Sequence, residues 1–197
     1  DLAYLRCLPN MVICAPSDER ELSRMLWTGL QHDGPFAVRY PRETGPGVAW
    51  DLQEQPIEIG KGNVVRQGHR VAILALGPML RKAVEAADIL IPEGLEPTIV
   101  DMRFAKPIDS DLLRSLAQTH THFVTCEDHV LHGGFGSAVC ETLQDQAVYG
   151  TPVLRLGLPD KVIEHGTRDE IFRDYRLAPD QIASRIEEFI HTASFAL

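Results

Sequence analysis

Four consecutive residues near the start of the chain, Arg39-Tyr40-Pro41-Arg42, combine two cations with the end of an expected strand. A proline keeps the residue before it extended and cannot continue a strand ladder, so Pro41 places Arg42 just beyond the strand end. Open α/β sheets bind ligands beyond the carboxyl ends of parallel strands, where a guanidinium can hold a phosphate or carboxylate through two hydrogen bonds. Arg42 is therefore a candidate anion-binding residue, with Tyr40 a secondary candidate. The alternative is a surface arginine that pairs with Glu43.

A second group of reactive side chains, Glu127-Asp128-His129, precedes the glycine-rich turn at residues 133–136. Glu127, Asp128 and His129 are candidates for an acid–base cluster, and a solvated loop is the alternative. A glycine-rich turn that opens a helix can approach a phosphate, although the dinucleotide-binding spacing G-x-G-x-x-G is absent. The glycines suit equally well the close packing of a helix on a strand, or a contact with another subunit.

The rest of the sequence lacks the common catalytic and metal-binding signatures. It contains no G-x-S-x-G, no P-loop and no metal-binding loop. The cysteines form no C-x-x-C pair and do not stand at zinc-finger spacing, so we expect buried thiols in a reducing compartment and no metal site. They are Cys7, Cys14, Cys126 and Cys140.

The elements that position Arg42 follow from the hydrophobic pattern. Residues 11–14 are β-rich, apolar residues recur at helical spacing over residues 18–31, and residues 36–40 form the next strand. Ser17 is the expected N-cap of the helix. This order of strand, helix and strand predicts a parallel crossover unit, as in α/β proteins.

A segment without periodicity, residues 43–56, predicts a linker to a second α/β unit. In that unit strands alternate with helices, which predicts a doubly wound sheet whose first strand lies antiparallel at the edge. The expected strands are residues 57–65, 70–76, 97–104, 122–126 and 153–156, and the expected helices are one opened by Gly77-Pro78, then 112–117, 137–146, 168–175 (capped by Thr167) and 179–191.

Composition excludes several classes of protein. The 197 residues are 44% hydrophobic and 24% charged, which supports a folded core. The formal net charge of −9 argues against duplex nucleic acid as a partner. No run of 18 apolar residues is present, so we expect no membrane-spanning helix.

Together these segments resemble the thiamine-diphosphate-dependent transketolase superfamily, and within it the C-terminal third of the 1-deoxy-D-xylulose-5-phosphate synthase family. The most specific motifs are Tyr-Pro-Arg at 40–42 and Gly-Leu-Pro-Asp…His-Gly-Thr at 157–167. The matching stretches, in order along the chain, are residues 1–13, 15–19, 33–42, 100–109, 133–139 and 157–167.

The resemblance implies a division of the chain into three parts. Residues 1–42 would be the C-terminal part of a pyrimidine-binding domain with a parallel α/β sheet. Residues 43–56 would be a linker, and residues 57–197 a transketolase C-terminal domain of the α/β/α type. The opening Asp1 without an initiator Met leads us to expect a piece of a longer chain.

The resemblance also implies an activity. The family's synthase condenses pyruvate with glyceraldehyde 3-phosphate, releases carbon dioxide, and supplies precursors of isoprenoids, thiamine and pyridoxal. Thiamine diphosphate, Mg²⁺ and the catalytic residues would belong mostly to upstream parts, so we expect no catalytic residue and no activity in this chain alone. Arg42 would match the arginine that grips the aldehyde's phosphate. The family usually has Gly after that arginine, where this chain has Glu43.

The resemblance also has implications for the oligomeric state and the cellular location. The resemblance implies a homodimer in the cytoplasm, or in the plastid stroma if the source is a plant. Two alternatives share the same domains: the beta subunit of a 2-oxoacid dehydrogenase, whose substrate lacks a phosphate, and a non-catalytic dimerisation module.

Overall fold

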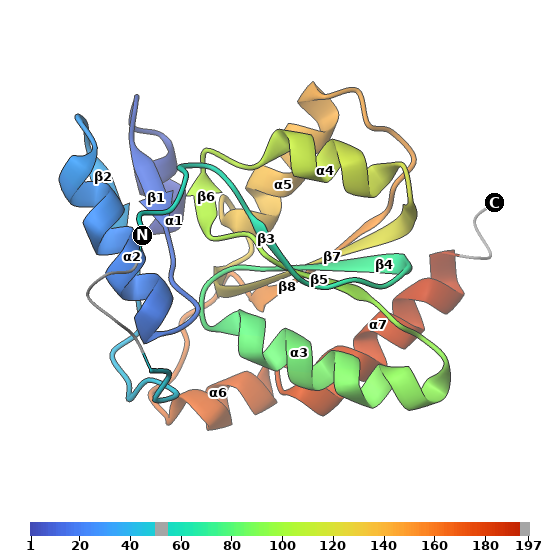
Figure 1. The fold of residues 1–197 in the computed structure, drawn as a ribbon. Helices are drawn as coiled ribbons and strands as arrows, with labels where there is room; N and C mark the ends of the chain where they lie inside the picture. Colours follow the sequence, from blue (N-terminus) through green and yellow to red (C-terminus); the bar gives the residue numbers. More distant parts are fainter. Residues whose placement is uncertain (50–54, 194–197) are drawn as a thin grey trace.

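The first unit is a short strand–helix–strand crossover that follows one helical turn (Figure 1). In the computed structural model, which describes residues 1–49 and 55–193, strands β1 and β2 pair in parallel, and this confirms the predicted crossover. The elements of this unit are α1 (Leu2–Arg6), β1 (Val12–Cys14), α2 (Glu19–Gln31) and β2 (Phe36–Val38).

The helix α2 begins one residue later than predicted. Its N-cap is Asp18, whose carboxylate accepts the backbone N–H of Glu21 at 2.8 Å, so the prediction of Ser17 as the cap is wrong. Both residue types cap helices well, and the extended backbone of Asp18 decides between them. Ser17 instead donates its hydroxyl to Asp101 Oδ2 in the second unit, at 2.8 Å.

The second unit contains a five-stranded sheet in the order β3-β5-β4-β7-β8. The edge strand β3 is antiparallel to β5 and the other pairs are parallel, as predicted. Its strands are β3 (Asn63–Arg66), β4 (Arg70–Ala75), β5 (Thr98–Asp101), β7 (His120–Val130) and β8 (Val153–Leu158).

Helices cover both faces of this sheet and make a three-layer α/β/α domain (Figure 1). Side chains alternate along β4, so Ile73 packs with α3 and α7 whereas Leu74 packs with α4 and α5. The α/β fold class is therefore confirmed. The helices are α3 (Met79–Leu90), η1 (Ile91–Glu93), α4 (Ser110–Ala117), α5 (Phe135–Asp145), α6 (Arg168–Asp174) and α7 (Pro179–Ala193).

A strand from the second unit joins the sheet of the first. The single strand predicted over residues 97–104 is wrong, because the chain leaves the large sheet after Asp101 and Arg103 takes a left-handed backbone with φ 58°. Beyond it β6 (Phe104–Lys106) pairs antiparallel with β1, in the order β2-β1-β6. The two units therefore share one sheet as well as a packed interface.

The segment before β3 is also less regular than predicted. The strand predicted over residues 57–65 is formed only from Asn63 onward, because the chain turns at Gly60, where φ is +78°. Ile57 is buried and its N–H donates to Thr28 Oγ1 at 2.7 Å. The predicted linker, residues 43–56, has no helix or strand at 43–49 and 55–56, and residues 50–54 lie outside the described part of the chain. None of the described helices is long and apolar enough to cross a membrane.

Candidate functional site

The segment that carries Arg42 follows directly on β2. This strand ends at Val38, and the Arg39 N–H donates to Cys14 O at 2.8 Å, the last contact with β1. Arg42 is exposed, and within residues 1–49 and 55–193 its guanidinium takes part in no ion pair or hydrogen bond. A cation with no acid to neutralise it, at the carboxyl end of a parallel strand, is suited to bind an anion.

Glu43 does not pair with Arg42. Its carboxylate instead accepts a hydrogen bond from Arg168 Nη1 at the start of α6. The alternative of a local Arg42–Glu43 pair is therefore wrong. Although the carboxylate of Glu43 follows Arg42 directly in sequence, it pairs with Arg168 and so leaves Arg42 unpaired among the described residues.

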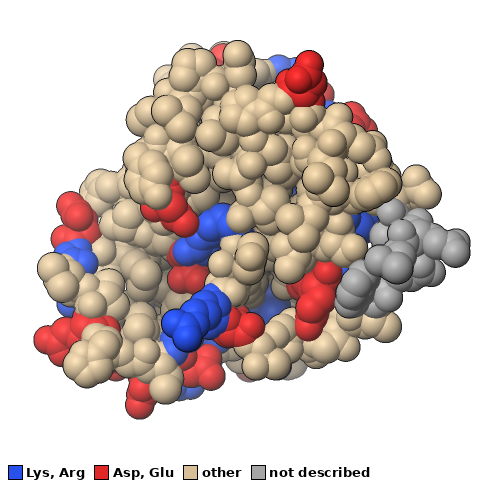
Figure 2. Space-filling view, turned by 90° about the vertical axis from the view of Figure 1, so that its left-hand side faces the viewer, with Lys and Arg blue, Asp and Glu red and all other residues tan. Residues whose placement is uncertain are grey.

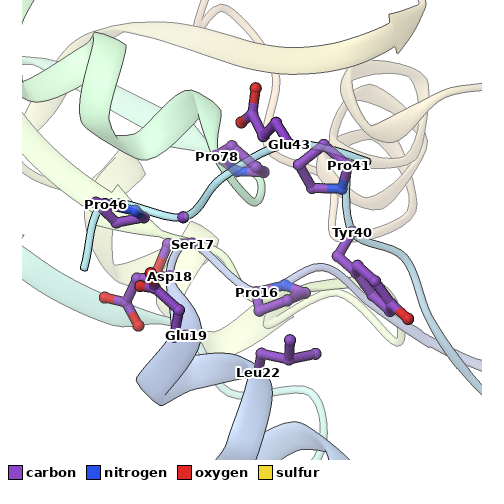
Figure 3. A pocket seen from close by; sticks show the side chains of 11 residues that line it. Pro16, Ser17, Asp18, Glu19, Leu22, Tyr40, Pro41, Glu43, Pro46 and Pro78 are labelled. Carbon is purple, nitrogen blue, oxygen red and sulfur yellow. The ribbon is translucent and has the colours of Figure 1, made fainter. Parts of the chain in front are cut away.

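A small pocket of about 130 Å³ lies between this segment and the start of α2 (Figure 3). Tyr40 and Pro41 face Pro16 and Leu22 across it, and Pro78 closes the side toward α3. Tyr40 is 59% exposed. The lining is mainly apolar, its charged residues Asp18, Glu19 and Glu43 are all acidic, and it does not include Arg42, so the pocket is not suited to bind an anion.

Glu127 caps a helix. It lies in β7 with no exposed surface, and its carboxylate accepts the backbone N–H groups of Phe135 at 2.6 Å and Gly136 at 2.8 Å. These are the donors at the start of α5 that a phosphate would need, so the carboxylate occupies the anion position of this helix. Burial raises the pKa of Glu127 to about 7, against the lowering effect of the two N–H groups. The alternative of a solvated loop is wrong.

His129 lies two residues along the same strand and is also buried. Its Nδ1 is 2.8 Å from the carbonyl oxygen of Val130, and because a carbonyl only accepts, Nδ1 carries the proton. Burial lowers the pKa of His129, which favours the neutral ring. In the described chain no hydrogen bond joins His129 to Glu127 or Asp128, so these contacts give no support to the predicted acid–base cluster.

The glycine-rich turn serves close packing. A Cβ on Gly134 would lie 2.1 Å from Glu127 Oε2, and one on Gly136 would lie 2.6 Å from Thr125 Oγ1. Both glycines therefore let the start of α5 approach β7 closely enough for Glu127 to reach its N–H groups. Of the two interpretations of this turn, helix-on-strand packing is the one that the contacts support.

The described residues include no group of three His, Cys, Asp or Glu side chains that could hold a metal ion. All four cysteines are free thiols; Cys14 and Cys126 are buried as predicted, whereas Cys7 is exposed, so the prediction of a buried thiol is wrong there. Burial raises the pKa of Cys14 and of Cys126 to about 12, so neither thiol is a nucleophile near neutral pH.

The sequence does not predict that two residues, Asp128 and Arg168, meet beside Glu43. Asp128 and Arg168 lie 40 positions apart in sequence, yet Arg168 Nη2 donates to Asp128 Oδ2 at 2.8 Å beside Glu43. From the sequence, Asp128 is predicted only as a member of the acid–base cluster, and Arg168 only as the first residue after the cap Thr167. No sequence spacing relates them, because the long connection from β7 through β8 to α6 brings them together.

Comparison with known proteins agrees with this architecture. Residues 60–182 match the transketolase C-terminal domain, and residues 1–47 match the transketolase pyrimidine-binding domain. The chain belongs to the transketolase family. Within this family, the chain is 46% identical over 190 residues to 1-deoxy-D-xylulose-5-phosphate synthase 1 of Geobacter metallireducens. The aligned residues make up 96% of this chain and 30% of that protein. The synthase of Trichodesmium erythraeum is 50% identical over 190 residues, 94% of the chain and 29% of that protein.

Solved structures of transketolases have the same fold. A split-gene transketolase described as an inactive β4 tetramer superposes with a TM-score of 0.86 at 34% identity, over 95% of this chain and 60% of that one. A transketolase mutant from Pichia stipitis gives 0.67 at 18% identity, over 98% of this chain and 27% of that one, and shows the fold alone. The chain spans about 30% of the length of the curated synthases it matches, in their C-terminal part.

Proposed function

We propose that this chain is the C-terminal part of a synthase that condenses pyruvate with glyceraldehyde 3-phosphate to 1-deoxy-D-xylulose 5-phosphate, with loss of carbon dioxide. The observation that carries the proposal is the exposed, unpaired guanidinium of Arg42 at the end of β2, among the described residues. An aldehyde that carries a phosphate needs such a cation, and the identity of 46–50% to named synthases supports the same substrates.

In this proposal residues 1–42 form the end of the pyrimidine-binding domain and residues 57–197 the C-terminal domain. The aldehyde's phosphate accepts two hydrogen bonds from Arg42, which holds the carbonyl carbon near the reacting centre. Pro41 fixes the backbone before Arg42 and so limits the positions that the guanidinium can take. The product would be a precursor of isoprenoids and thiamine.

Thiamine diphosphate, when bound, supplies the electron sink that the decarboxylation of pyruvate requires. The side chains of residues 1–49 and 55–193 do not fit Mg²⁺, since no three acidic, His or Cys groups converge there. The proposal therefore assigns Mg²⁺ and the diphosphate to other parts of the enzyme, and this chain to the aldehyde. The inactive β4 assembly of the related split-gene transketolase supports inactivity of this part alone.

The proposal includes a homodimer. Figure 2 looks onto the side of the molecule where α1 and α2 lie, and its upper part is largely uncharged. Large apolar side chains are exposed on α1, α2 and the turn after α1, and such side chains favour a protein interface. The bacterial sources of the relatives support the cytoplasm as the location. The large apolar side chains exposed on α1, α2 and the turn after α1 are Tyr4, Leu8, Leu26, Trp27 and Leu30.

The test is product formation by the intact enzyme that contains this chain. With thiamine diphosphate and Mg²⁺ present, we expect carbon dioxide release from pyruvate to depend on glyceraldehyde 3-phosphate, and mass spectrometry to detect the condensed sugar phosphate. The 197-residue chain alone is the control and should give no product. Turnover of pyruvate that is indifferent to the aldehyde would support the 2-oxoacid dehydrogenase alternative and contradict the proposal.

A further inference from the structure

The segment that carries Arg42 is weakly held by its own backbone. After the Arg39 N–H, no backbone–backbone hydrogen bond from residues 40–46 reaches any described part of the chain. The next backbone contact is made by the Gly47 N–H, which donates to Glu19 Oε1 at 2.7 Å. Between these two points, the polar contact that holds the segment against the described part of the chain is the pair of Glu43 with Arg168.

Both ends of this short segment are linked to one residue, Asp128. At its start, Arg39 Nη2 donates to the backbone oxygen of Asp128 at 2.6 Å, and Arg39 Nη1 lies 3.7 Å from Asp128 Oδ2. At its end, Glu43 is held by Arg168, which also donates to Asp128 Oδ2 at 2.8 Å. Asp128 thus anchors the residues that flank Arg42 on both sides.

The Arg168 guanidinium is well fixed for this bridging role. Its two Nη groups contact different carboxylates, and its Cζ lies 4.8 Å from the centre of the Phe172 ring. The Asp128 side chain is only 16% exposed, and that of Arg168 24%, so water screens this pair little. A lysine has one ammonium group and cannot reproduce the planar fork that meets two carboxylates.

We propose that Asp128 and Arg168 are positioning residues that set the place of Arg42, and so the affinity of the enzyme for the phosphate of its aldehyde substrate. This inference rests on the proposed function. Neither residue touches the substrate; both act through the backbone of residues 40–43. The C-terminal domain would thereby contribute to substrate specificity through a side-chain bridge to the pyrimidine-binding domain.

The test uses the intact synthase with Arg168→Met, which keeps the apolar stem against Phe172 and removes both ion contacts. We expect KM for glyceraldehyde 3-phosphate to rise about fivefold or more, with KM for pyruvate within about twofold of wild type. Turnover of D-glyceraldehyde, which has no phosphate, should not change. Arg168→Lys should give a smaller rise, and Glu43→Gln should reproduce part of it.

A matched control is Arg173→Met on the same helix, which removes an exposed pair with Asp180 and should leave both KM values unchanged. Because Arg168 acts through Arg42, we expect Arg168→Met to add nothing further to the effect of Arg42→Ala in the double variant. Equal losses for phosphorylated and unphosphorylated aldehydes, additive effects in the double variant, or an unchanged KM in Arg168→Met would overturn the inference. If Arg42→Ala itself leaves aldehyde use unchanged, the proposed function fails instead.

Discussion

Asp101, at the end of β5, is a carboxyl group in a place that water hardly reaches. It is 2% exposed, and its two oxygens accept the Ser17 hydroxyl at 2.8 Å and the Arg103 N–H at 3.0 Å. Burial raises the pKa of Asp101 to about 7, and the nearby Glu21 acts in the same direction, whereas Ser17 and Arg103 oppose it. Because the folded state holds the proton more tightly than the unfolded chain, Asp101 lowers stability as pH rises.

This gives a prediction for Asp101→Asn. The asparagine side chain can keep both contacts, because its oxygen accepts the Arg103 N–H and the Ser17 hydroxyl can turn to accept from its NH₂ group. Relative to wild type, the free energy of unfolding of the variant should rise by about 1–3 kcal/mol as pH increases from about 4 to about 7, and level off above that. Urea titrations over this pH range measure the difference in free energy of unfolding between the variant and wild type. Glu127 titrates in both proteins, so its contribution cancels in this difference. Parallel profiles for the two proteins would contradict the raised pKa.

At the same scale, the sequence predicted where a residue such as Arg42 lies in the fold better than it predicted which side chains contact each other. Pro41 and the strand before it were enough to place Arg42 beyond a strand end. The partner of Glu43 could not be predicted, because Arg168 arrives from a helix more than 100 residues later. The role of Glu127 as a helix cap could not be predicted either. Its carboxylate extends from a strand, whereas the N–H groups that donate to it belong to the start of the following helix.

At the scale of elements, the packing of α5 on β7 depends on the absence of a side chain at Gly134. An added Cβ would lie 2.1 Å from Glu127 Oε2 and 2.7 Å from the Val130 carbonyl oxygen, and a backbone atom cannot easily move away. We expect Gly134→Ala to lower the free energy of unfolding by about 2–4 kcal/mol through this overlap and the lost cap.

The comparison variant is Gly166→Ala, where the nearest atom would be 3.5 Å from the new Cβ. The free energy of unfolding of this variant should stay within about 1 kcal/mol of wild type. Both values come from urea denaturation followed by far-ultraviolet circular dichroism. A Gly134→Ala protein as stable as the Gly166→Ala protein would show that α5 can shift on the sheet.

The hydrophobic periodicity was enough to predict the order of the helices and strands along the chain. It was not enough to predict which strands pair in which sheet. The predicted strands at 70–76 and 122–126 alternate with helices, which was enough to predict a parallel sheet with an antiparallel edge, although β7 extends further at both ends, over His120–Val130. β6 has only three residues and follows β5 after a two-residue bend, so local pattern could not separate them. Its pairing with β1 is a long-range contact that no local propensity encodes.

At the scale of the whole molecule, the two units are joined by the pairing of β6 with β1 and also by ion pairs. Arg103 donates to both carboxylate oxygens of Glu21, at 2.8 and 3.0 Å, and Arg24 contacts the same carboxylate at 2.8 Å. A bidentate pair that is largely buried resists separation more than an exposed one does. These contacts fix the first unit against the second, which is the arrangement that the proposed bridge from Asp128 and Arg168 to the segment with Arg42 requires.

The central claim is that Arg42 binds the phosphate of the aldehyde substrate. Charge-assisted hydrogen bonds contribute roughly 1.5–3 kcal/mol each, so in the intact enzyme Arg42→Ala should lower kcat/KM for glyceraldehyde 3-phosphate by about tenfold to a hundredfold or more. KM for pyruvate should hardly change, and Arg42→Lys should restore only part of the loss, because an ammonium lacks the planar fork. Steady-state kinetics with each substrate varied in turn provide the measurement. Equal losses for pyruvate and the aldehyde, or no loss for either, would contradict the claim.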